Sequence, residues 1–226
     1  MEKSIMMERP IEVLYEDNHL IAVKKPAGEL VQGDASGEPS LMDRVKIFIK
    51  ERDKKPGNVF LGLVHRLDRP VSGIVLFAKT SKGASRISEQ FRERKTKKTY
   101  RALIEGEITP LSGTLRTNLI KDGSRRTAEI SKDGKEAVLD YRTIEKGKRI
   151  SLIEIDLGTG RFHQIRAQLS EAGHPIVGDI KYGAKIFLPN GIIALSAIGL
   201  EFEKATGSEK TSVKIPEPAE WKKMIS

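Results

Sequence analysis

Between residues 100 and 157 the sequence repeats one short pattern. Apolar and polar residues alternate within short runs, and glycine, aspartate and lysine turns separate the runs. Alternation with a period of two is typical of antiparallel strands that bury one face. We therefore expect an antiparallel meander made of the runs Tyr100 to Gly106, Thr114 to Leu119, Thr127 to Ile130, Ala137 to Thr143 and Ile150 to Leu157.

A hairpin and two helices are expected before the meander. Ile11 to Tyr15 and Leu20 to Lys24 read as two short strands joined by a polar turn. Ser40, followed by Asp43, is typical of a capped amphipathic helix running towards Arg52. Ser81 is the expected cap of a second helix, which leads into a basic segment.

Between these helices a charged loop, His65 to Gly73, is flanked by apolar runs at Phe60 to Val64 and Ile74 to Ala78. These runs predict strands that present the loop from a buried base. Within the loop Asp68 stands between two arginines, which favour its ionised form and suit a nucleophile or an electrostatic anchor better than a proton donor. A surface ion-pair cluster that closes the connection fits the same residues equally well.

The two arginines of this loop have different expected roles. Side chains alternate in an extended stretch, so Arg66 and Asp68 are expected on one face and His65, Leu67 and Arg69 on the other.

Positive charge points to a polyanionic partner. The chain has 40 Lys and Arg against 31 Asp and Glu, a net charge of +9. Six basic residues lie between Arg92 and Arg101, and Tyr100 lies among them. Cations with an interleaved aromatic ring suit nucleic acid, since the ring can stack on an exposed base. The alternative is a solvated helix end followed by a strand in which Tyr100 packs as an ordinary strand residue.

After the meander, Gly158 to Arg166 changes to a helical period, which predicts a glycine loop and a helix that ends near Gly173. The loop lacks the third glycine of a dinucleotide fingerprint, so we reject a cofactor site there. His163 and His174 are not spaced as a metal pair, and structural hydrogen bonding is the better default. The tail is expected to hold strands at Ile192 to Ala197, Leu200 to Phe202 and Ser212 to Ile215, and a last helix near Trp221.

Several classes of protein are disfavoured by composition. Cysteine is absent, which excludes disulfides and thiolate metal sites. Met1 to Pro10 has no apolar core of signal-peptide length, and no run approaches a membrane span. We expect a soluble, intracellular protein with no membrane contact, and a single domain as the starting assumption.

Four segments, in matching order and separation, resemble the RluA-type pseudouridine synthases, enzymes that isomerise uridine in ribosomal and transfer RNA. The first is similar to the family's lysine, proline and glycine motif, the second to its central motif, the third to the segment with the active-site tyrosine and the fourth to its third motif. They are Lys24 to Gly28, His65 to Arg69 with Ser72 and Gly73, Lys98 to Tyr100, and Thr159 to Arg166 with Gly173 to Asp179, Tyr182 and Gly183.

The resemblance implies the site residues. Asp68 would be the catalytic aspartate, and Arg161 would pair with it and keep it ionised. Tyr100 would stack on the uracil ring, while Arg66 would contact RNA and occupy the gap left by a flipped nucleotide. His65 and Arg69 would be structural. No cofactor and no metal is implied, because isomerisation involves no redox step and no external group.

The resemblance also implies an α+β fold with a mixed, mainly antiparallel sheet, a central catalytic cleft and flanking helices, in one catalytic domain over residues 1–226 with its core at about 11–203. The expected partner is an rRNA or tRNA stem-loop, and we expect a cytoplasmic monomer. Phe162 and Ser196 depart from the family pattern, where threonine and histidine are common. The alternatives are a non-catalytic RNA-binding or folding factor that uses the same basic cleft, and a base-cleaving enzyme.

Overall fold

The computed structural model describes residues 9–207 and 209–225, and the chain forms two compact units. Unit 1 comprises residues 9–96 and 201–214, and unit 2 comprises residues 97–200 and 215–225. The expected single domain over 1–226 includes residues 1–8, 208 and 226, which lie outside the described residues, as does most of the Met1 to Pro10 stretch.

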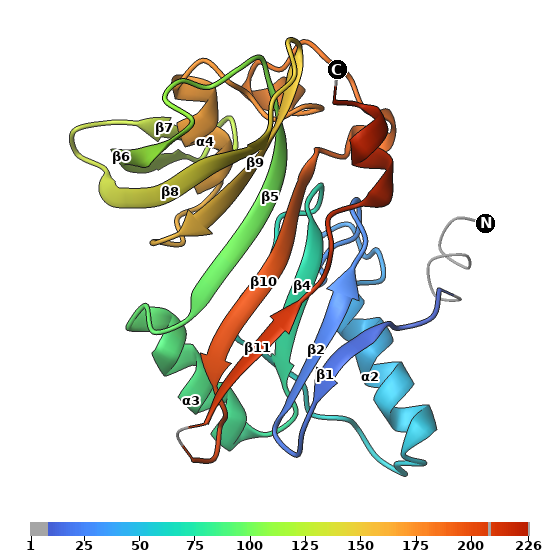
Figure 1. Ribbon diagram of the computed structural model, residues 1–226. Helices are drawn as coiled ribbons and strands as arrows, with labels where there is room; N and C mark the ends of the chain where they lie inside the picture. The colour runs from blue at the N-terminus through green and yellow to red at the C-terminus, as the bar shows by residue number, and fades with distance from the viewer. Residues whose placement is uncertain (1–8, 208, 226) are drawn as a thin grey trace. The chain divides into compact units, whose positions relative to one another are not determined.

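Antiparallel strands form the base of unit 1. Strands β1 (Val13–Glu16), β2 (Leu20–Lys25) and β4 (Ser72–Ala78) lie side by side in that order, and β3 (Gly62–Leu63) also pairs with β4 (Figure 1). The side chains of β2 and β4 are almost completely buried. Strand β11 (Lys210–Lys214) pairs with β10 (Leu195–Glu203), whose last residues belong to this unit.

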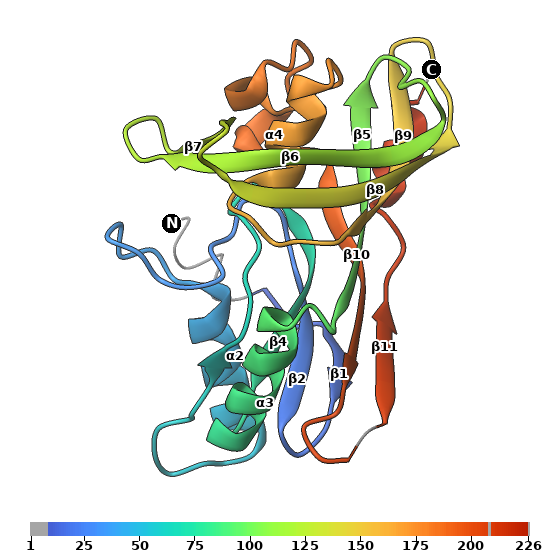
Figure 2. The same ribbon diagram turned by 90° about the vertical axis from the view of Figure 1, so that its left-hand side faces the viewer.

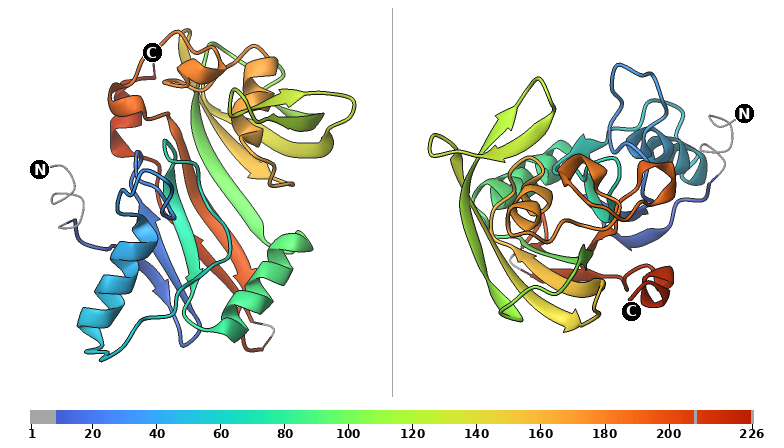
Figure 3. Two further views of the ribbon diagram at one scale, coloured as in Figure 1. Left: turned by 180° about the vertical axis from the view of Figure 1, so that it is seen from behind. Right: turned by 90° about the horizontal axis from the view of Figure 1, so that it is seen from above.

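Helices α2 (Leu41–Arg52) and α3 (Ser81–Arg92) lie on the same side of β2 and β4 (Figure 3). The predicted capping box of α2 is confirmed, since Ser40 and Asp43 bond each other's backbone N–H. The predicted cap of α3 is wrong by one residue. Thr80 is the N-cap, because it is still extended and its hydroxyl accepts from Gly83 N, whereas Ser81 is already helical.

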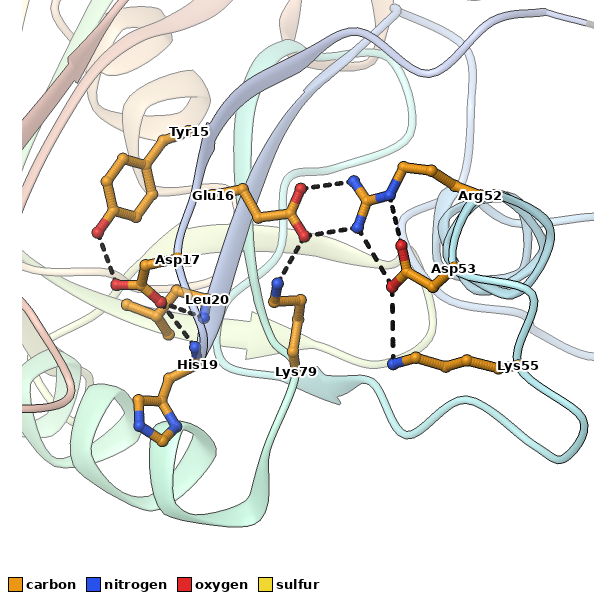
Figure 4. A network of polar contacts seen from close by, with 9 residues as sticks. All are labelled: Tyr15, Glu16, Asp17, His19, Leu20, Arg52, Asp53, Lys55 and Lys79. Atoms are coloured by element: carbon orange, nitrogen blue, oxygen red, sulfur yellow. Dashed lines mark hydrogen bonds and ion pairs between the residues drawn. The ribbon is translucent and has the colours of Figure 1, made fainter.

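The β1–β2 hairpin is tied to the end of α2 by Glu16. Its carboxylate accepts hydrogen bonds of 2.6 and 2.8 Å from Arg52 and of 2.5 Å from Lys79 (Figure 4). Hydrogen bonding by Arg52 holds the pKa of Glu16 below its usual value, although burial acts in the other direction. In the turn, Asp17 accepts from the backbone of Leu20, so the hairpin is closed locally as well.

Unit 2 contains the five antiparallel strands predicted from Tyr100 onwards. They run in the order β5 (Lys97–Glu105), β9 (Ile150–Leu157), β8 (Lys135–Glu145), β6 (Ser112–Asp122) and β7 (Thr127–Ile130) (Figure 2). They do not form the predicted meander, because β5 pairs with β9 and β6 pairs with β8. Helix α4 (Gln164–Glu171) packs beside β6 and β7 over a small core of Leu119, Ala128, Ala137 and Ala167. Gly173, just after α4, has the positive φ of 84° that suits a helix end.

The tail differs from the prediction. The two strands expected at Ile192 to Ala197 and Leu200 to Phe202 form one strand, β10, which begins only at Leu195. Gly199 lies within this strand beside Thr99, whose Cβ would be 3.2 Å from a Cβ at residue 199. The final helix is a short 3₁₀ turn, Ala219–Lys223, and further 3₁₀ turns cover Ile180–Tyr182 and Pro189–Gly191.

The apolar run before the charged loop also contains less strand than expected. Of Phe60 to Val64, only β3 (Gly62–Leu63) is strand. The class predicted from the sequence is nevertheless confirmed, since helices accompany mostly antiparallel strands in an α+β fold. Among the helices of residues 9–207 and 209–225, none is both long and apolar enough to cross a membrane.

Candidate active site

The loop between β3 and β4 is fixed at its start by His65 and Leu67. His65 Nε2 accepts a hydrogen bond of 2.9 Å from Leu76 N, and the ring stacks on Phe91 with centroids 4.8 Å apart. Leu67 is buried. These two contacts leave the backbone around Asp68 little freedom to shift.

The end of the loop is fixed by Arg69. Its Nε donates to Gly28 O at 3.0 Å, and its two terminal nitrogens bond both carboxylate oxygens of Glu38 at 3.2 and 2.7 Å. Gly28 N returns a bond of 2.8 Å to Arg69 O. The contacts give Arg69 the structural role that was expected, and they join the loop to the segment around Gly28.

Asp68 lies between these two anchors, and its side chain is half-buried. Its backbone carbonyl accepts from Val71 N at 3.0 Å, which closes the turn that leads into β4. The carboxylate acts electrostatically on Lys25, a buried cation of the same unit. Asp68 is therefore presented from a rigid loop whose neighbours serve the scaffold.

Lys25 is the residue of this region for which the sequence predicted no individual role. It ends β2 opposite Gly73 and is completely buried. Its Nζ donates three hydrogen bonds, to Pro26 O at 3.0 Å, Glu29 O at 2.8 Å and Arg69 O at 3.1 Å. A lysine–proline–glycine segment was the only available signal, and it gave no indication that this lysine reaches the loop of Asp68.

Burial lowers the pKa of Lys25 to about 7, whereas the carboxylates of Glu29 and Asp68 act to raise it. Glu29 is itself buried and forms an ion pair of 2.6 Å with the buried Arg44 of α2. The Lys25 ammonium thus connects the segment around Glu29, helix α2 and the loop of Asp68.

Arg66 has a different environment from Arg69. Its side chain is exposed, and in the described part of the chain it forms no ion pair. The predicted separation of the two arginines is consistent with these contacts, since one is bound to the scaffold and the other faces solvent.

Tyr100 lies on β5 in unit 2, where it pairs with Ile155 and is 9% exposed. The basic segment around it is partly neutralised. Lys95, Lys97 and Arg101 form ion pairs with Glu93, Asp156 and Glu154, respectively. The local charge available to a polyanion is therefore smaller than the sequence count suggests.

Arg161 also lies in unit 2, on the glycine loop between β9 and α4. Its Nε donates to Glu136 O on β8 at 2.9 Å, and its backbone N–H donates to Gln164 Oε1 at 3.0 Å. Lys98 is a neighbour of this loop, since a Cβ at Gly160 would lie 3.5 Å from Lys98 Nζ.

A buried polar network supports the other side of the glycine loop. Arg166 bonds both oxygens of Asp179 at 2.7 and 2.8 Å and His163 Nε2 at 2.9 Å, while His163 Nδ1 bonds the Tyr182 hydroxyl at 2.8 Å. His163 has a left-handed backbone, with φ of 50°. These contacts hold a conformation that non-glycine residues rarely adopt.

Histidines have the structural roles that their spacing suggested. His163 belongs to the network just described, and His174 Nδ1 lies 3.1 Å from Glu105 O. Within residues 9–207 and 209–225, no three His, Asp or Glu side chains are grouped as a metal site would require.

The four predicted site residues are divided between the units. Arg66 and Asp68 lie on one loop of unit 1, and Tyr100 and Arg161 lie in unit 2. The pairing of Arg161 with Asp68 and the cleft around them stay predictions.

Comparison with known proteins gives consistent matches. Residues 19–171 match the family described as RNA pseudouridylate synthase. An uncharacterized RNA pseudouridine synthase of Aquifex aeolicus is 32% identical over 231 residues, covering 96% of this chain and 72% of that protein. The ribosomal large subunit pseudouridine synthase C of Buchnera aphidicola is 36% identical over 176 residues, covering 76% of this chain and 54% of that protein.

The fold is similar to a solved structure as well. Human RNA Pseudouridylate Synthase Domain Containing 4 superposes with a TM-score of 0.79 at 23% identity, over 96% of this chain and 93% of that one. At this identity the likeness concerns the fold alone.

Proposed function

This chain belongs to the RNA pseudouridylate synthase family, and from that premise we propose that it isomerises specific uridines of ribosomal or transfer RNA to pseudouridine, with Asp68 as the catalytic residue. The observation that supports this assignment best is the position of Asp68. It lies on a half-buried turn between Leu67, which is buried, and Arg69, which is bound to the scaffold. The net charge of +9 suits a polyanionic substrate.

In the proposed reaction the target uridine is flipped out of its stack, which costs a few kcal/mol and least in a loop, so we expect a stem-loop substrate. The ionised Asp68 acts on the nucleotide, the C1′–N1 bond breaks, the base rotates and a bond forms between C1′ and C5. The hydrogen on C5 then leaves to solvent, and N1 takes up a proton. The atoms balance without an oxidant, a reductant or a cofactor.

The other three residues have proposed roles around this step. Arg66 is exposed and would contact RNA where the flipped nucleotide has left a gap. Tyr100 would stack on the uracil ring, and Arg161 would pair with Asp68 and keep it ionised. The proposal takes the protein as a monomer with one catalytic domain, working in the cytoplasm on rRNA or tRNA.

Transcribed RNA labelled with tritium at uridine C5 tests this function. Isomerisation releases the label to water, whereas an RNA-binding factor releases none and a base-cleaving enzyme leaves an abasic site. We expect release from bulk cellular RNA that lacks the modification. If purified protein releases no tritium from such RNA, the assignment as an isomerase is wrong.

A further inference from the structure

The loop that carries Arg161 leaves the sheet where the β8–β9 ladder ends. The last pair of that ladder is Leu139 with Leu157, so Val138 has no partner on β9. The loop turns across Val138 instead, and Gly158 N and Thr159 N both donate to Val138 O at 3.1 Å. The backbone carbonyl of Val138 therefore binds the start of the loop that carries Arg161.

The side chain of Gln164 fastens the loop to this point. Gln164 is 3% exposed, and its Oε1 accepts from Arg161 N at 3.0 Å and from the Thr159 hydroxyl at 2.6 Å. Its Nε2 donates to Val138 O at 3.0 Å. Thr159 Oγ1 in turn accepts from Val138 N at 2.9 Å. One carboxamide thus bonds both the strand and the backbone of Arg161.

Arg161 takes its side-chain position from the same strand. Its Nε donates to Glu136 O, two residues before Val138 on β8. The backbone N–H and the guanidinium of Arg161 are therefore both held to β8, one through Gln164 and the other directly. Losing the carboxamide would remove the bond to Arg161 N and leave the bond from Gln164 N to Arg161 O at 3.2 Å and the side-chain bond to Glu136 O. A misplacement of about 1 Å in a catalytic site can cost about 100-fold in rate.

We propose that Gln164 is a positioning residue, which holds the backbone of Arg161 against β8 so that the guanidinium is presented to the reacting site. This inference rests on the proposed function, because it assumes that Arg161 takes part in the isomerisation. Gln164 itself touches neither substrate nor Asp68 in this account and acts only through Arg161.

Gln168 provides a matched control on the same helix. It is 1% exposed, and its Nε2 donates to Leu115 O, Ala137 O and the Thr117 hydroxyl at 3.0 to 3.1 Å. It therefore also ties α4 to the sheet, but these bonds go to β6 and β8 and not to the loop of Arg161. A purely structural role would make the two glutamines equivalent.

The experiment compares tritium release by Gln164→Met and Gln168→Met at a temperature where circular dichroism shows both folded. We expect kcat of Gln164→Met to fall by about 100-fold and that of Gln168→Met by less than about 3-fold, with RNA affinity kept in both. If Gln164→Met does not fold, Thr159→Val replaces it, with Thr159→Ser as the variant that restores the hydroxyl; kcat should fall only in Thr159→Val.

A double variant tests the route through Arg161. In the Arg161→Ala background, Gln164→Met should cause no further loss of kcat, because the group that it positions is already absent. Independent, multiplying losses would overturn the inference. Equal kcat for the two methionine variants, in a wild type that releases tritium, would overturn it while the proposed function stood. A wild type that releases none would remove both.

Discussion

Lys25 Nζ and the backbone carbonyl of Arg69 are joined by a hydrogen bond of 3.1 Å, which fixes the residue directly after Asp68. We expect Lys25→Met to leave the carbonyls of Pro26, Glu29 and Arg69 without this donor. The lost hydrogen bonds outweigh the relief from burying an ammonium, so unfolding should become easier by about 1–3 kcal/mol. Turnover should fall while RNA affinity is retained. Urea unfolding measures the change in stability, tritium release measures turnover and filter binding measures RNA affinity.

The neighbouring Lys24 is the control for that variant. Its side chain is about half exposed and, within residues 9–207 and 209–225, forms an ion pair of 3.3 Å with Glu12 and no other. Lys24→Met should therefore change stability and turnover very little. Equal behaviour of the two variants would contradict the role given to Lys25.

The lowered pKa of Lys25 predicts how stability varies with pH. The folded protein releases this proton near pH 7, whereas the unfolded chain keeps it to the usual pKa of 10.5. Between these two pKa values the unfolded state binds more protons than the folded state, so the free energy of unfolding increases as pH rises from 7 towards 10.5. Below pH 7 the Lys25 ammonium is protonated in both states, and this increase is absent. Wild type should gain stability relative to Lys25→Met between pH 6.5 and 9. A constant difference across that range would contradict the prediction.

Two arginines of α2 should differ sharply in their effect on stability. Arg44 and Glu29 are both buried, and Arg44→Met would leave a buried carboxylate unpaired, at a cost of about 3–5 kcal/mol. Arg52 pairs with Glu16 near the surface, where such a pair contributes about 0–1 kcal/mol. Urea unfolding of Arg44→Met and Arg52→Met measures the loss of free energy of unfolding in each variant. Equal losses would show that burial does not make the Arg44–Glu29 pair more important for stability than the Arg52–Glu16 pair.

Arg66 should affect RNA and not the fold. Because its side chain is exposed, Arg66→Ala should leave the melting temperature unchanged. If Arg66 contacts a phosphate, Arg66→Ala should bind RNA more weakly. The slope of the logarithm of its binding constant against the logarithm of salt concentration should fall by about one unit. Arg86→Ala, an exposed arginine on α3, is the control and should bind like wild type. Unchanged binding by Arg66→Ala would rule out the contact.

The elements that local chemistry specifies were predictable from the sequence. Ser40 and Asp43 form the capping box that their spacing predicted, and the alternation after Tyr100 predicted the five strands β5 to β9 near their observed positions along the chain, although not their pairing order. The strands expected at Ile192 to Ala197 and Leu200 to Phe202 were wrong in their bounds, since the chain forms one strand over Leu195–Glu203.

The candidate site was predictable only in part. The alternation of side chains along an extended stretch predicted that Arg66 and Arg69 lie on opposite faces. The contacts agree with this, since Arg69 bonds Glu38 and Arg66 is exposed. The role of Lys25 was hidden, because its three partners are carbonyl oxygens, which every residue carries and no sequence pattern marks. Gln164 was hidden for the same reason, since it recognises the backbone of Val138 and Arg161.

The catalytic role of Asp68 is tested by comparing wild type with Asp68→Asn in the tritium release assay on unmodified RNA. Asparagine has nearly the same shape, and the backbone bond from Val71 N to the carbonyl of residue 68 is retained, so the variant should fold and bind RNA. We predict that its release falls by at least about 1,000-fold, because the amide cannot act as the ionised carboxylate does. Release by Asp68→Asn equal to that of wild type would show that Asp68 is not the catalytic residue.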